Sequence, residues 1–137
     1  MKKKIFLPIL LLASLFFSFV TGNAQDSRKV IVVINRADWC PLCQANGEKV
    51  MKDVIPVFNE PGVLFIMNDL TNDATKSDSK MKLEAAKVFP AVKKIAATGM
   101  LLIVDAGNGK LLEKISVAES AEKLINTIRK SCMKDKM

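Results

Sequence analysis

The chain has 137 residues, with 21 lysine or arginine and 14 aspartate or glutamate residues, so its formal charge is +7. This length favours one domain. The sequence contains no histidine, which excludes histidine-based acid–base catalysis and most zinc enzymes. The basic residues are spread along the chain, so the charge indicates a solvated surface and we expect no nucleic-acid partner.

The first 24 residues have the pattern of a secretory signal. Lysines at positions 2–4 precede an apolar run from Ile5 to Val20, and small Gly22 and Ala24 stand at the −3 and −1 positions of a signal-peptidase site. The apolar run is shorter than the ~20 residues that a membrane span needs, which favours cleavage over an uncleaved anchor. We therefore expect a mature domain over 25–137, periplasmic or secreted from a bacterium, with no stable membrane anchor.

The mature chain starts with a β-branched run, Val30 to Ile34, which is typical of a strand buried on both faces. After a loop over Asn35 to Trp39, a helix is expected to start at the cysteines and to run to about Phe58, because Pro41 suits a first helical turn. Its predicted apolar stripe consists of Val50, Met51, Val54, Val57 and Phe58.

A second apolar strand is predicted over Val63 to Met67, after a turn. The polar segment from Asn68 to Ser79 is predicted to be mostly loop. A helical region is then expected from Lys80 to Ala96, interrupted near Pro90 because proline cannot continue a helix.

The C-terminal part predicts a β-hairpin and a helix. Strands are expected over Met100 to Val104 and Lys110 to Ile115, joined by a turn at Gly107-Asn108-Gly109, residues that tolerate positive φ. A capping-box spacing places the start of the last helix at Ser116. Its apolar positions have helical spacing: Ala121, Leu124, Ile125 and Ile128. The order β-α-β-α-β-β-α predicts an α/β fold with a central four-stranded mixed sheet flanked by helices.

Cys40 and Cys43 are the candidate catalytic residues. They follow a buried strand and open a helix, whose N–H groups and macrodipole stabilise a thiolate at Cys40. Cys43 lies one helical turn later, close enough to form a disulfide with Cys40, and is expected to sit deeper as the resolving thiol. No cofactor is required, since the cysteines themselves carry the electrons.

The run Trp39-Cys40-Pro41-Leu42-Cys43 resembles the active-site motif of the thioredoxin family. The order of elements resembles that family's minimal fold over roughly residues 28–132. The resemblance implies thiol–disulfide exchange with other exported proteins and with a redox partner, in which Cys40 attacks and Cys43 resolves. It also implies that Trp39 belongs to the apolar surface that meets the partner, with Pro41 and Leu42 around the active site; core packing of Trp39 is the alternative.

Two positions depart from the family pattern. Ile34 stands six residues before the first cysteine, where the family usually has a buried acid, and Asp38 is expected to be exposed. Gly99 stands where the family has a cis-proline, with Thr98 before it. A glycine has no ring to shield the sulfurs, which would let a metal approach both thiolates.

Two other functions stay open on the sequence alone. One is a soft-metal, copper-type binding or metallochaperone module that uses the same cysteines, with Met100 beside them. The other is a redox-inert interaction domain in which the disulfide is only a staple. The sequence does not distinguish a reductase from an oxidase or an isomerase.

Cys132 is a third cysteine outside the C-x-x-C pair, which is unusual in an exported protein. The last helix should carry it to the pole opposite Cys40, roughly 21 Å away at ~1.5 Å per residue.

Overall fold

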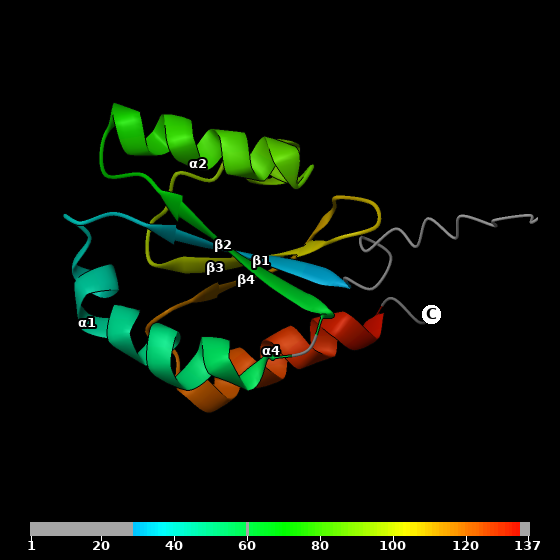
Figure 1. Ribbon diagram of the computed structural model, residues 1–137. Helices are drawn as coiled ribbons and strands as arrows, with labels where there is room; N and C mark the ends of the chain where they lie inside the picture. Colours follow the sequence, from blue (N-terminus) through cyan, green and yellow to red (C-terminus); the bar gives the residue numbers. More distant parts are fainter. Residues whose placement is uncertain (1–28, 60, 135–137) are drawn as a thin grey trace, which may run out of the picture.

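Four strands form one mixed sheet in the computed structural model of the chain, which describes residues 29–59 and 61–134 (Figure 1). β1 (Val30–Arg36) runs parallel to β2 (Val63–Asp69) and antiparallel to β3 (Met100–Asp105). β4 (Leu111–Ser116) pairs antiparallel with β3, so the order across the sheet is β2-β1-β3-β4. The predicted strands and the predicted fold class are confirmed. The predicted signal lies outside the described residues.

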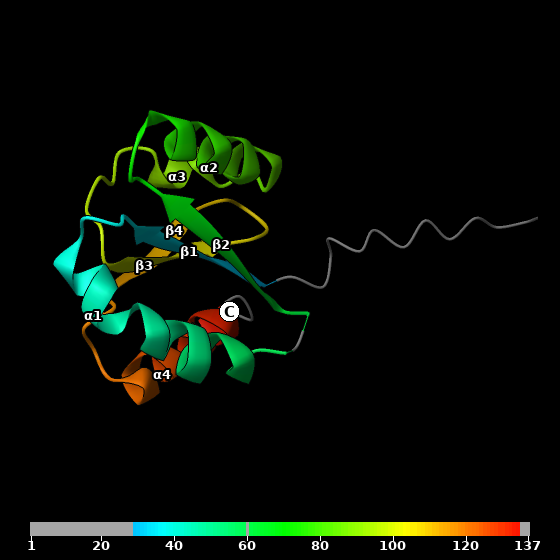
Figure 2. The same ribbon diagram turned by 60° about the vertical axis from the view of Figure 1, so that its left-hand side comes forward.

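The helices cover both faces of this sheet. Figures 1 and 2 show α1 (Pro41–Lys49) and α4 (Ala121–Lys134) on one face, and α2 (Asp73–Ala85) with the short α3 (Phe89–Val92) on the other. None of the helices in the described part of the chain is long and apolar enough to span a membrane.

Alternate residues of the sheet supply two cores. The core under α1 and α4 contains Val30, Val32, Ile34, Val50, Val54, Leu101, Ile103, Leu124 and Ile128. The core under α2 and α3 contains Ile31, Val33, Leu83, Val88, Val92, Leu102 and Val104. β1 is therefore buried on both faces, which explains why its sequence is continuously apolar rather than alternating.

The first helix begins at the cysteines, as predicted. It continues from α1 into a π-helical turn, Val50–Val54, and a 3-10 turn, Ile55–Val57, where Pro56 removes a backbone donor. Val50 and Val54 are buried, but Met51 and Val57 are 52% and 42% exposed, so the apolar stripe is narrower than predicted.

The prediction of a loop up to Ser79 is wrong, because α2 already begins at Asp73. Asn72 caps it: its side chain accepts a hydrogen bond from the Thr75 N–H, and Thr75 reciprocates in a capping box. Ser79 is buried and its hydroxyl accepts a hydrogen bond from the Asp69 N–H at 2.8 Å. A small polar residue thus faces the sheet where the sequence pattern would need a large hydrophobe.

The start of α4 differs from the prediction as well. Ser116 ends β4, and its hydroxyl accepts a hydrogen bond from the Ala118 N–H in a turn. The capping role belongs to Ser120, whose hydroxyl accepts from the Lys123 N–H at 3.2 Å. The helix then runs from Ala121 to Lys134. Its C-terminal end, with Cys132, lies across the molecule from the start of α1 (Figure 1), as predicted.

Candidate active site

Cys40 lies at the N-terminus of α1 and caps that helix. Its backbone is extended, and its Sγ accepts a hydrogen bond from the Cys43 N–H at 3.3 Å. Pro41 occupies the first turn, where no donor is needed. Both cysteines are thiols in this structure. The Cys40 sulfur is thus placed at the positive end of a helix, where a thiolate is favoured.

Cys40 exposes less of its surface than Cys43, which differs from the expectation that Cys43 sits deeper. Cys40 is only 3% exposed, because Leu42 and the segment at Gly99 lie against it. Cys43 is half-buried and lines a cavity of about 140 Å³ together with Arg36, Gly47, Met51 and Met67. The second cysteine therefore has its own opening beside α1.

The two thiols have pKa values shifted in opposite directions. Burial opposes ionisation of Cys40, but hydrogen bonds from the Cys43 thiol, the Thr98 side chain and the backbone N–H groups of Cys43 and Leu42 outweigh it and lower its pKa. The pKa of Cys43 is raised, first by burial and then by its hydrogen bond to Cys40 and by the Cys40 charge. Cys40 is therefore the thiol that ionises first.

We expect Thr98→Val to raise the pKa of Cys40, because the variant removes a hydrogen bond that favours the thiolate. In the reduced protein, the rate of Cys40 alkylation by iodoacetamide should then rise with pH at a higher midpoint than in the wild type. Thr127→Val is the matched control, since its hydroxyl bonds only to the Lys123 carbonyl on the exposed side of α4. An unchanged midpoint in Thr98→Val would contradict this role.

Gly99 lies against the cysteines, as expected for the position that replaces the cis-proline. Its N–H donates to the Asn35 carbonyl at 2.8 Å, and its carbonyl accepts from the Val117 N–H at 2.9 Å. Its φ is +73°, and a Cβ there would stand 2.9 Å from the Leu42 Cβ and 3.6 Å from the Cys40 Sγ. Proline cannot adopt this φ and other residues are strained there, so the backbone requires glycine.

Asn35, which was expected in a loop, is a structural residue of the site. It is fully buried at the end of β1, and its amide donates to the carbonyls of Ile95 and Ala97 at 3.0 and 3.2 Å. Its side-chain oxygen accepts a hydrogen bond from the Asn68 amide at 2.9 Å. These bonds hold the segment that leads to Thr98 and Gly99.

Asn35→Ala is expected to lower the free energy of unfolding by about 2 kcal/mol, because it leaves buried polar groups without their partner. Urea unfolding of the reduced protein measures this. Asn126→Ala on the exposed side of α4 should change the same quantity by less than about 0.5 kcal/mol. Equal effects of the two substitutions would show that the Asn35 network contributes nothing.

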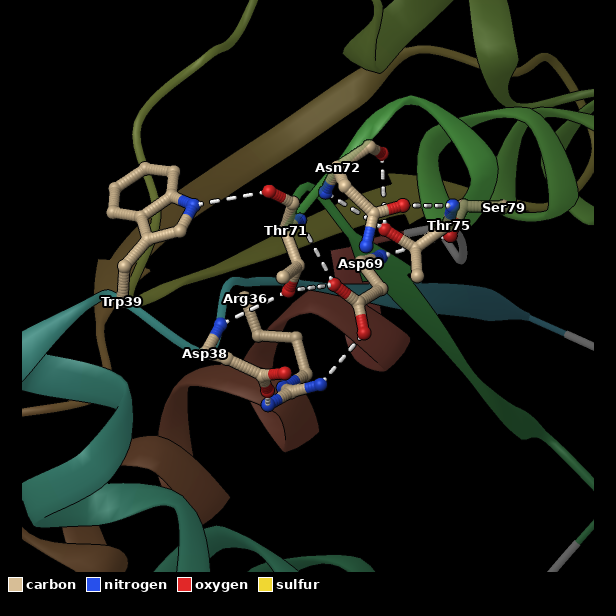
Figure 3. A network of polar contacts seen from close by, with 8 residues as sticks. All are labelled: Arg36, Asp38, Trp39, Asp69, Thr71, Asn72, Thr75 and Ser79. Carbon is tan, nitrogen blue, oxygen red and sulfur yellow. Dashed lines mark hydrogen bonds and ion pairs between the residues drawn. The ribbon is translucent and has the colours of Figure 1, made fainter.

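A polar network fixes the loop before Cys40 (Figure 3). Arg36 forms ion pairs with Asp38 and, at 2.7 Å, with Asp69. The Asp38 N–H donates to the Thr71 hydroxyl at 3.0 Å, and the Trp39 indole N–H donates to the Thr71 carbonyl at 3.2 Å. The network joins the active-site loop to the segment after β2, and it holds the indole at the surface.

The same network explains two charge effects. Burial works against the Asp69 carboxylate, but hydrogen bonds from Thr71 and the charge of Arg36 outweigh it and lower the pKa of Asp69. The pKa of Arg36 is raised, mainly by its hydrogen bond to Asp38 against the cost of burial, and partly by the Cys43 charge. Arg36, which pairs with both carboxylates, also lines the cavity of the second thiol. Arg36 and Asp69 are opposite each other at the ends of the parallel strands β1 and β2. Two residues of opposite charge at the ends of two predicted parallel strands are a sequence pattern from which this ion pair could have been predicted.

The remaining residues that the sequence predicts around the active site lie at the surface, except Ile34. Trp39 is 61% exposed, so it lies at the surface and not in the core; Pro41 is exposed and Leu42 is 43% exposed. Asp38 is exposed, as expected. Ile34 is buried in the core beneath α1, so its position holds no carboxylate.

Comparison with protein families and with curated proteins finds no match. Solved structures do match. The solution structure of a candidate protein disulfide isomerase from Bacteroides thetaiotaomicron has a TM-score of 0.51 at 15% identity, over 79% of this chain and 77% of that one. Thioredoxin from Fasciola hepatica gives 0.49 at 20% identity, over 77% of this chain and 85% of that one. Trxlp from Edwardsiella tarda has a TM-score of 0.48 at 18% identity, over 77% of this chain and 86% of that one. The chain has the thioredoxin fold, with Cys40 and Cys43 adjacent as a C-x-x-C pair at the start of α1.

Proposed function

We propose that the chain is an exported thiol–disulfide oxidoreductase that exchanges disulfides with other exported proteins through Cys40 and Cys43. The observation that carries this is the Cys40 sulfur, which caps α1 with a lowered pKa while the Cys43 pKa is raised. One stabilised thiolate beside one protonated thiol is what sequential attack and resolution require.

The exchange proceeds in two steps. The Cys40 thiolate attacks one sulfur of a substrate disulfide, which forms a mixed disulfide and releases the other substrate sulfur as a thiolate. The Cys43 thiolate then attacks Cys40, which closes the Cys40–Cys43 disulfide and releases the second substrate thiolate. The substrate gains two electrons, the protein loses them, and the protons of the protein thiols pass to the substrate thiolates or to water. The reverse sequence oxidises a substrate dithiol.

Residue 34 is an isoleucine, so no carboxylate at that position takes the proton of Cys43, and the ionisation of Cys43 has to be favoured in another way. Two causes of its raised pKa, the hydrogen bond to Cys40 and the Cys40 charge, disappear once Cys40 is bound in the mixed disulfide. Loss of these two causes lowers the pKa of Cys43, although burial still opposes its ionisation. The second thiol thus becomes reactive after the first step.

Trapping the mixed disulfide tests this function. The Cys43→Ser variant, in a Cys132→Ser background, should form a covalent adduct with a protein that contains disulfides, such as oxidised insulin. The adduct is visible as an increase in mass that dithiothreitol removes. Cys40→Ser in the same background is the control and should form none. Adducts of equal yield in both variants would contradict the assignment of attacking and resolving thiols.

Export is supported by the N-terminal pattern of lysines, an apolar run, and small Gly22 and Ala24. We expect the protein recovered from expressing cells to begin at Gln25 and to be located in the periplasm or the medium. N-terminal sequencing gives this directly. An intact N-terminus in the membrane fraction would show an uncleaved anchor instead.

A soft-metal site is a second candidate function, and one observation favours it. Met51 and Met67 line the same cavity as Cys43, whereas Met100, the expected neighbour, packs in the core under α2. Thiolate and thioether ligands select Cu(I). No group of three or more Cys, Asp or Glu within the described ranges could hold a metal, so a site would depend on these methionines. Cu(I) titration against a colorimetric chelator should give one equivalent in the wild type and less in Met51→Leu/Met67→Leu; equal uptake by both would exclude it.

A further inference from the structure

An apolar groove lies beside Trp39, between the active-site loop and the helices α2 and α3. It has a volume of about 420 Å³. Its apolar walls come from the indole and from side chains of α2, α3 and the segments that follow β2 and α3: Leu70, Leu83, Phe89, Val92, Ile95 and Ala96. It is a separate cavity from the one that Cys43 lines.

The charged residues that line this groove are all lysines. Lys76 and Lys80 come from α2, and Lys93 follows α3. The Lys80 ammonium stands 5.4 Å from the centre of the Phe89 ring, and its exposed ion pair with Glu84 is 3.7 Å long. Lys76 likewise meets exposed Asp73 at 3.8 Å. Such exposed pairs are weak, so the ammonium groups remain available to an incoming anion.

The groove is placed to receive the chain that Cys40 attacks. Trp39 is next to Cys40 in sequence, and the bond from its indole N–H to the Thr71 carbonyl fixes the ring at the edge of the groove. A polypeptide that is joined to Cys40 through a mixed disulfide and extends over Trp39 reaches the lysines.

We propose that this groove docks an acidic and apolar segment of the substrate protein, next to its reactive cysteine. An apolar side chain of that segment fills the groove, and aspartate or glutamate residues beside it pair with Lys76, Lys80 and Lys93. Charge complementarity is the argument for this occupant, since an all-lysine rim selects against basic segments. The proposal rests on the proposed exchange function and names the class of substrate.

Two peptide disulfides test the proposal. They share a central Leu-Cys segment, and one carries flanking glutamates where the other carries lysines. The reduced protein should reduce the acidic peptide about tenfold faster at low salt, and the ratio of rates should fall as salt screens the charges. Lys80→Glu/Lys93→Glu should reverse the preference. Lys110→Glu/Lys130→Glu, with the same change in net charge on exposed residues outside the groove, should keep the wild-type ratio.

Binding is measured separately from exchange. Trp39 is the only tryptophan in the chain, so its fluorescence should change when an acidic peptide without cysteine binds, and should not change when the basic peptide is added.

Equal rates and equal binding for both peptides would overturn the docking proposal. Reduction of the neutral 2-hydroxyethyl disulfide would in that case leave the exchange function standing. Loss of exchange with every disulfide, together with specific binding of the acidic peptide, would overturn the exchange function and support the groove. A dimer that Trp39→Ala dissociates, or tight binding to anionic vesicles with no peptide preference, would also overturn the docking proposal.

Discussion

Replacing Cys40 by serine is expected to reduce disulfide exchange by on the order of a thousandfold or more, to the background rate. Cys40 Sγ is the thiolate that the helix N-terminus and its hydrogen bonds stabilise. A serine hydroxyl stays protonated at neutral pH and cannot form the mixed disulfide. Turnover is measured with a small neutral disulfide and a glutathione-coupled readout.

The control for this substitution is Cys132→Ser. Cys132 belongs to the last turn of α4, across the molecule from the start of α1 (Figure 1), so the variant should keep the wild-type turnover. If Cys40→Ser kept more than a tenth of the wild-type rate, the nucleophile would have to be another group.

Gly99→Ala is expected to lower the free energy of unfolding by about 2–4 kcal/mol, and to slow exchange. A side chain at φ +73° is strained, and the new Cβ would lie 2.9 Å from the Leu42 Cβ, which belongs to the rigid start of α1. The segment at Gly99 has to move away from Cys40, so the Thr98 hydrogen bond to the thiolate weakens as well. Urea unfolding of the reduced protein and the pH dependence of Cys40 alkylation measure the two effects.

Gly47→Ala provides the matched control, because a Cβ at that position meets no atom within 4 Å outside the neighbouring backbone of its own helix. Gly47 lies inside α1, where alanine is favoured over glycine, so this variant should gain about 0.5–1 kcal/mol. Leu42→Gly should recover the part of the Gly99→Ala loss that comes from the clash, which a double-mutant cycle isolates. Equal unfolding free energies for Gly47→Ala and Gly99→Ala would show that the active-site loop does not require glycine.

The strands and the position of the cysteines could be predicted because their signals are local. Val30 to Ile34 is apolar throughout because both faces of β1 are covered, and the β3–β4 turn contains Gly109, whose φ of +70° favours glycine. The start of α2 had no such signal: it depends on the capping box at Asn72 and on Ser79, which contacts the sheet through a hydrogen bond. Polar helices of this kind resemble loops in sequence.

The details of the active site depend on contacts between distant segments. The sequence located Cys40, Cys43, Trp39 and Gly99, but the order of burial of the two cysteines follows from Leu42 and the Gly99 segment closing over Cys40. The Asn35 bonds to Ile95 and Ala97 span about sixty residues of chain and leave no local pattern. Likewise, Met67 of β2, rather than Met100, lines the cavity of Cys43, and Met67 and Cys43 are distant in sequence.

The reduction potential of the Cys40–Cys43 pair tests the central claim most directly. The Cys132→Ser protein is equilibrated in glutathione buffers and its thiols are trapped by alkylation. We predict one reversible two-electron transition, in which both thiols disappear together, at a potential between about −120 and −270 mV. A value near or below about −230 mV would identify a reductase, and one between about −120 and −180 mV an oxidase or isomerase. A pair that forms no reversible disulfide, or one that stays oxidised below about −300 mV as structural disulfides do, would contradict the account.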